Sequence, residues 1–108
     1  MQMSAEERDA LSQVTQTLRD RFGVREVILY GSAARGQLDE ESDIDLLVVL
    51  PKIDWEIQKE IIGVCFAAEL QCGRVFSATC YTTEEMEDSP LRSSPLVLAA
   101  RREGQRLP

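Results

Sequence analysis

The sequence predicts a small α/β domain in which helices flank a short mixed β-sheet. Two segments, 24–30 and 44–50, are rich in β-branched and other apolar residues and are followed by Gly31 and Pro51, as strands commonly are. Before and after them, apolar residues recur every three or four positions, which is typical of amphipathic helices. Strands interleaved with helices in this way favour one sheet with helices packed against it.

Each predicted element has recognisable boundaries. Ser4 and Glu7 have the spacing of a capping box at the start of the first helix, and Gly23 is a natural stop for it. The stripe of this helix consists of Leu11, Val14, Leu18 and Phe22. After the strand 24–30, the remaining elements are expected as a short helix 32–35, a strand 44–50, a helix 54–70, a strand 74–81, a short helix from Thr82, and a last helix from Ser94 toward Gly104.

Length and composition predict a single domain spanning residues 1–108. The chain contains no apolar run of about 20 residues that could span a bilayer, and its acidic start lacks the features of a signal peptide. We therefore expect no membrane association and a cytoplasmic location. Three cysteines without a short paired spacing, Cys65, Cys72 and Cys80, indicate reduced thiols rather than disulfides or a zinc site.

The charge balance narrows the classes of function. The net charge is −7 and the chain has no histidine. Because nucleic-acid binding depends on Lys and Arg that neutralise phosphates, direct nucleic-acid binding is not expected. An acidic chain is instead a reasonable host for a divalent cation that arrives with a nucleotide.

One constellation carries chemistry: a Gly31-Ser32 turn followed after a gap of ten residues by Asp43 and Asp45. Glycine lets the backbone turn sharply and approach a ligand, and a serine at a helix start offers a hydroxyl and backbone N–H groups to an anion. Asp43 and Asp45 are two residues apart at the start of a strand, so both project from one face. Their Cα atoms would be roughly 6.5 Å apart, where like charges repel by about 2–3 kcal/mol at an effective dielectric near 20. A hard cation such as Mg²⁺, or Mn²⁺ in its place, would relieve that repulsion.

Two neighbouring features also bear on the kind of site. A calcium loop beginning at Asp39 is excluded by Ile44, which stands where such a loop needs glycine. Arg35 leaves two possibilities open: it points at the same phosphates, or it pairs with Asp39 or Glu40.

These motifs resemble those of nucleotidyltransferases with the DNA polymerase β-like fold. The short length and the run Gly-Ser-Ala-Ala-Arg-Gly are similar to the smallest branch of that superfamily, the minimal nucleotidyltransferases. The resemblance implies that Gly31 and Ser32 bind the phosphates of a nucleoside triphosphate such as ATP, and that Asp43 and Asp45 hold Mg²⁺ and are catalytic. An acceptor hydroxyl would attack the α-phosphorus and release pyrophosphate.

The sequence departs from the family pattern at one position. The family has a third carboxylate on the following strand, which here offers only Ser77 or Thr79, and the nearest acids, Glu69 and Glu84, belong to flanking helices. Two functions therefore stay open. The chain transfers a nucleoside monophosphate to a hydroxyl of a partner protein, or it is a degenerate binding module that neutralises its partner by forming a complex.

The resemblance also implies a partner. Minimal nucleotidyltransferases accompany small helical proteins of the HEPN class in toxin–antitoxin pairs. The helix 54–70 is apolar over more than one stripe, which indicates either core packing or, in part and together with Trp55, a face for such a partner.

Overall fold

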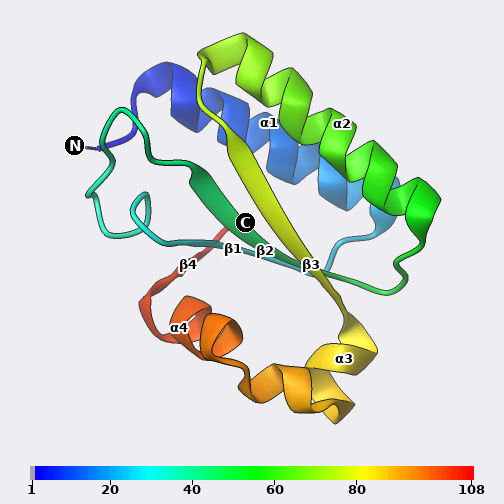
Figure 1. Cartoon of the computed structure of the whole chain (residues 1–108). Helices are drawn as coiled ribbons and strands as arrows, with labels where there is room; N and C mark the ends of the chain where they lie inside the picture. The colour runs from blue at the N-terminus through cyan, green and yellow to red at the C-terminus, as the bar shows by residue number, and fades with distance from the viewer. Residues whose placement is uncertain (1) are drawn as a thin grey trace.

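The computed structural model describes residues 2–108 and forms a four-stranded mixed sheet between helices (Figure 1). In chain order the elements are α1 (Ala5–Phe22), β1 (Glu26–Tyr30), β2 (Ile44–Leu50), α2 (Trp55–Cys72), β3 (Phe76–Thr82), α3 (Thr83–Asp88), a 3₁₀ turn η1 (Pro90–Ser93), α4 (Pro95–Glu103) and β4 (Gln105–Arg106). The strands lie in the order β3-β2-β1-β4. The predicted α/β class and mixed sheet are confirmed.

The sheet combines two kinds of connection. β1 pairs antiparallel with β2 through the loop that carries the Gly-Ser turn, and β4 pairs antiparallel with the other side of β1. β2 and β3 are parallel and joined by α2, which is the crossover that parallel neighbours require. As a result β2, which contains Asp45 and begins directly after Asp43, has a strand on either side.

Two apolar clusters lie on opposite faces of the sheet. α1 and α2 cover one face, whereas α3, η1 and α4 cover part of the other (Figure 1). Along β2, Ile44, Leu46, Val48 and Leu50 belong to the first cluster, and Leu47 and Val49 pack against Val97 and Ala100 of α4 on the second face. Both faces are therefore apolar along most of β2, which explains its nearly unbroken apolar sequence.

The helix boundaries follow the predicted caps. Ser4 and Glu7 form the capping box of α1 and Gly23 ends the helix in a left-handed conformation. Thr82 and Glu85 form a second capping box at α3, and Asp54 caps α2, whose main-chain N–H at Ile57 donates to the Asp54 carboxylate. Local side-chain bonds thus fix where these helices begin.

One local prediction is wrong, and two short elements were not expected. Residues 32–35 form consecutive turns rather than a helix, because Gly36 adopts a φ of 67° and the Gln37 N–H bonds back to the Ser32 carbonyl at 2.8 Å. η1 and β4 are absent from the elements expected from the sequence. β4 has two exposed polar residues without alternation, and only the free edge of β1 makes it a strand.

None of the helices within residues 2–108 is both long and apolar enough to cross a lipid bilayer.

Candidate active site

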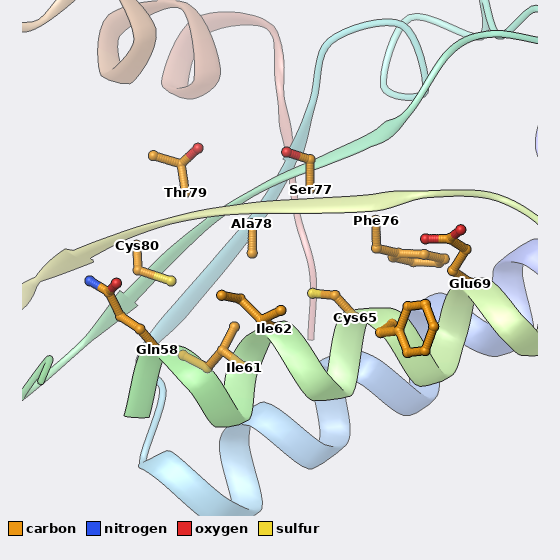
Figure 2. Close-up of a pocket in the computed structure, with 11 residues that line it drawn as sticks. Gln58, Ile61, Ile62, Cys65, Glu69, Phe76, Ser77, Ala78, Thr79 and Cys80 are labelled. Atoms are coloured by element: carbon orange, nitrogen blue, oxygen red, sulfur yellow. The ribbon is translucent and has the colours of Figure 1, made fainter. Parts of the chain in front are cut away.

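The sheet register brings one residue from each of three strands together. Asp45 of β2 lies opposite Tyr30, the last residue of β1, and opposite Ser77 of β3. In Figure 2 Ser77 and Thr79 point away from α2, whereas Phe76, Ala78 and Cys80 point toward it. Because side chains alternate along strands, Tyr30, Asp45 and Ser77 share the face opposite α1 and α2.

The two halves of the sequence motif are in direct contact. Gly31 has a φ of 73°, and a Cβ atom at this position would stand 2.6 Å from Asp45 Oδ2. The carboxylate of Asp45 therefore lies against the bare backbone of the Gly-Ser turn. The left-handed conformation favours glycine here, and any side chain at this position would also have to push the Asp45 carboxylate aside.

Asp45 is a half-buried carboxylate without a compensating charge. Burial raises its pKa above the ordinary value, and the nearby charge of Asp43 raises the pKa further. The Asp45 carboxylate makes no hydrogen bond or ion pair with any other of residues 2–108, whereas Asp43 is exposed to solvent just before β2 begins. An unpaired, partly buried carboxylate beside a second one is a setting that a cation would stabilise.

The Gly-Ser turn offers polar groups to the same space. The Ser32 carbonyl accepts the Gln37 N–H, and the Arg35 N–H donates to the Gly31 carbonyl at 3.3 Å. Within residues 2–108 the Ser32 hydroxyl makes no hydrogen bond to another residue, so it is free to meet a ligand. The backbone from Gly31 to Gly36 is thus held in consecutive turns, beside which the Ser32 hydroxyl stands open to a ligand.

The loop before Asp43 is anchored by Arg74, which lies between α2 and β3. Its guanidinium donates from Nη1 to the carbonyls of Asp39 (2.6 Å) and Ser42 (2.8 Å), and from Nε to Glu7 Oε2 (2.7 Å). The next residue contributes as well, because the Val75 carbonyl accepts the Ile44 N–H at 2.9 Å. The backbone is therefore held on both sides of Asp43, by two consecutive residues of another segment.

No carboxylate occupies the third position. Ser77 stands level with Asp45, Thr79 is two residues further, and neither is acidic. Glu69 lines the groove between α2 and β3, on the opposite face of the sheet (Figure 2), and Glu84 is exposed on α3. Neither of the acids considered from the sequence reaches the place beside Asp45.

The structure corrects the expected partners of Arg35. The side chain pairs with Glu103 at the end of α4 (3.5 Å) and its Nε donates to Gln37, not to Asp39 or Glu40. Asp39 instead accepts hydrogen bonds from the Glu41 N–H and the Ser42 hydroxyl, which hold the pKa of its carboxyl below the usual range.

Two residues of the site had no signal in the sequence. Tyr30 is half-buried opposite Asp45, and burial raises the pKa of its hydroxyl, with a hydrogen bond to Thr79 opposing that effect and the Asp45 charge adding to it. Arg74 is 31 residues after Asp43, and only the fold brings its guanidinium to the loop. Neither forms a local pattern with the aspartates.

The donor set fits a hard divalent cation with an anionic ligand. Two carboxylates provide oxygen ligands of the kind Mg²⁺ prefers, and Mg²⁺ commonly takes its other ligands from phosphates and water. Within residues 2–108 no cluster of three or more Asp, Glu, Cys or His side chains could hold a metal ion unaided. A phosphate-bearing ligand would thus complete the coordination.

A Gly-Ser turn in contact with one of two neighbouring carboxylates, where β1 ends and β2 begins, is an arrangement that suits nucleotidyl transfer. Residues 11–92 match the family model of the nucleotidyltransferase domain, which covers most of the chain. The chain belongs to this nucleotidyltransferase family.

Two proteins of similar sequence are named as protein adenylyltransferases. The chain is 32% identical over 80 residues to a putative protein adenylyltransferase of Methanocaldococcus jannaschii, a match that covers 72% of this chain and 76% of the relative. It is 53% identical over 36 residues to the protein adenylyltransferase MntA of Thermococcus cleftensis, which covers 33% of this chain and spans only 36% of that relative's length.

A solved structure supports the fold. The crystal structure of a mutant of the toxin–antitoxin MntA-HpeT contains a chain that superposes with a TM-score of 0.59, at 21% sequence identity, over 90% of this chain and 70% of that one. The shared architecture places this chain in the same fold as MntA.

Proposed function

We propose that this protein is a Mg²⁺-dependent nucleotidyltransferase that transfers AMP from ATP to a hydroxyl group of a partner protein. The observation that carries the proposal is the contact between Gly31 and the unpaired carboxylate of Asp45. It joins the phosphate-binding turn and the metal-binding pair in one site. The relatives described as protein adenylyltransferases support the choice of AMP and of a protein acceptor.

Each residue has a role that its environment supports. Gly31 gives the triphosphate access to the backbone, and Ser32 contributes its free hydroxyl and the N–H groups of the turn. Asp43 and Asp45 would hold Mg²⁺, or Mn²⁺, which supplies charge neutralisation for the phosphates when bound. Arg74 keeps Asp43 in place through the Ser42 carbonyl.

The reaction is a displacement at phosphorus. A bond forms between the acceptor oxygen and the α-phosphorus, the bond from that phosphorus to the bridging oxygen breaks, and pyrophosphate leaves. The acceptor proton passes to solvent, because Ser77 and Thr79 are not bases at neutral pH. The carboxylate next to Ser77 in the sheet register is that of Asp45.

We further propose that the acceptor belongs to a helical protein of the HEPN class, with this chain as the antitoxin of a toxin–antitoxin pair. The structural similarity to the MntA-HpeT toxin–antitoxin suggests this assignment. The partner's hydroxyl would be modified and its activity thereby suppressed.

One observation favours a second candidate function. The place beside Asp45 that holds a third carboxylate in the family pattern is occupied by Ser77. A chain without that group could still bind Mg²⁺ and ATP and neutralise the partner by complex formation alone. This binding module is the alternative to the enzyme.

Transfer of label separates the two candidates. The protein is incubated with ATP labelled at the α-phosphate, Mg²⁺ and the product of the adjacent gene. If the chain is an enzyme, label is expected on the partner. That label should disappear when the chain carries Asp43→Asn or Asp45→Asn. Tight complex formation with no label in any combination would leave only the binding module. Absence of any Mg²⁺–ATP stabilisation in a thermal melt would contradict both.

A further inference from the structure

The free edge of strand β3 lies next to an exposed apolar stripe of α2. β3 is the last strand in the order, with β2 as its one neighbour within residues 2–108. Natural edge strands are usually guarded by charges, proline or a bulge. β3 has the sequence Phe-Ser-Ala-Thr-Cys-Tyr-Thr, with no charge and no proline, and it pairs with β2 in register over seven residues without a bulge. Its outer side is therefore open to another strand.

The adjoining face of α2 is apolar and exposed. Ile62, Phe66 and Leu70 follow each other at four-residue intervals and are 62%, 56% and 72% exposed, and Trp55 continues the stripe toward the start of the helix. Ile62 and Phe66 also line a groove of about 510 Å³ together with residues of β3 (Figure 2). The stripe and the open strand edge thus border the same groove.

The size of this surface argues for an occupant. From their exposed fractions, the four apolar side chains present on the order of 500–600 Å², which is the upper end for patches on monomeric proteins. A standard interface buries about 800 Å² on each partner. The stripe, together with the backbone edge of β3, approaches that size.

We propose that this surface joins two copies of the chain into a symmetric dimer. A two-fold axis beside β3, perpendicular to the sheet, would pair β3 antiparallel with its copy and make one continuous sheet. The same rotation keeps both α2 helices on one face, side by side and antiparallel. A single symmetry operation thus covers both the strand edge and the stripe, as an isologous interface requires.

The residues of α2 match under this arrangement. We place the two-fold axis at the level of Val64. Each residue of one α2 then lies beside the residue of the second copy that is the same number of positions from Val64 on its other side. Ile62 then meets Phe66 of the second copy, and Lys59 is level with Glu69 of the second copy, an opposite charge. In Figure 2 Ala78, near the middle of β3, points toward the part of α2 that carries Ile62 and Cys65. The midpoints of strand and helix therefore lie near the same axis.

Molar mass in solution tests the dimer. Light scattering or sedimentation equilibrium of the wild type at high-micromolar concentration is expected to give twice the mass of one chain. Phe66→Glu is expected to give one chain's mass under the same conditions. Leu98→Glu is the matched control, because Leu98 is also exposed but lies on α4, on the other side of the sheet. It should leave the mass unchanged, with circular dichroism used to check that each variant is folded.

Charge reversal tests the antiparallel register. Lys59→Glu should weaken dimerisation and the added change Glu69→Lys should restore it, because the pair is re-formed with reversed signs. A monomeric wild type overturns the proposal, whatever other protein binds the stripe. A dimer that persists in Phe66→Glu also overturns the proposal. If Glu69→Lys does not restore dimerisation to the Lys59→Glu variant, the antiparallel register is wrong.

Discussion

The carboxylate of Asp45 occupies the space that a side chain at Gly31 would need, with Oδ2 only 2.6 Å from the position of a Cβ atom. Gly31 directly follows β1, and Asp45 belongs to β2, where it faces Tyr30 in the register. The proposed phosphate-binding turn and the proposed metal ligand are therefore one packing unit. A change in either is expected to alter the other.

Gly31→Ala should abolish Mg²⁺–ATP binding. The added methyl would displace the Asp45 carboxylate, and the left-handed φ would cost alanine roughly 1–2 kcal/mol of stability. Gly73→Ala is the matched control, because Gly73 has a φ of 78° and open space around its Cβ position. Thermal melts with and without Mg²⁺–ATP should show similar destabilisation in both variants but a lost ligand shift in Gly31→Ala alone. A preserved shift in Gly31→Ala would contradict the proposed site.

Asp45→Asn should leave the metal-free protein as stable as the wild type or more so. The wild-type carboxylate is half-buried without a partner among residues 2–108, so its charge carries a desolvation cost that the amide avoids. The same variant should lose the stabilisation by Mg²⁺–ATP. Chemical denaturation in a chelator, compared with denaturation in Mg²⁺–ATP, measures both effects. A large loss of stability in the chelator would show that Asp45 is structural.

The sequence predicts most of the fold because its signals are local. Capping residues, glycine stops and apolar periodicity act within a few positions, and they place α1, α2 and the long strands correctly. Gly31 and Asp45 are found as motifs for the same reason. β4 is different, since Gln105–Arg106 become a strand only by pairing with the edge of β1. Arg74 is different too, because its partners are 32 to 67 residues away in the chain.

Arg74→Lys should reduce metal affinity as well as stability. A lysine keeps the charge beside Glu7 but cannot hold Glu7 and the Asp39 and Ser42 carbonyls together, since it lacks the planar fork of arginine. We expect a loss of about 2 kcal/mol of unfolding free energy and about tenfold weaker Mn²⁺ binding in the presence of ATP, as is typical when the support of a metal ligand is lost. Electron paramagnetic resonance of free Mn²⁺ measures that affinity.

Glu7→Gln is the matched control for Arg74→Lys. It removes the charge pair with Arg74 but leaves the two bonds from Nη1 to the loop, so stability should fall while Mn²⁺ affinity is kept. Equal Mn²⁺ affinity in the wild type and Arg74→Lys would contradict a positioning role for Arg74. Hydrogen exchange at residues 39–44 should be faster in Arg74→Lys than in Glu7→Gln.

Glu7 should also make the free energy of unfolding depend on pH in the acid range. Burial alone would raise the pKa of its carboxyl, but hydrogen bonds from Ser4 and Arg74 and the Arg74 charge outweigh burial and hold the pKa below its ordinary value. Because the folded pKa is lower than the unfolded one, the stabilisation is complete above the unfolded pKa and is lost as pH falls through the folded pKa. Urea midpoints measured from about pH 7 to about pH 3 should fall less steeply at the acid end in Glu7→Gln. Parallel curves would refute the assignment.

Ser77→Asp should strengthen the site by supplying the third carboxylate that the family pattern has and this chain lacks. Ser77 stands level with Asp45 and is exposed on the proposed active-site face, so a carboxylate here would add a third oxygen ligand for a divalent cation. We expect Mn²⁺ in the presence of ATP to bind about tenfold more tightly, a gain of about 1.4 kcal/mol, and label transfer to the partner to become faster. Ser77→Asn has the same shape without the charge and should produce neither change. If Ser77→Asp binds Mn²⁺ no better than Ser77→Asn does, position 77 is not the missing ligand position.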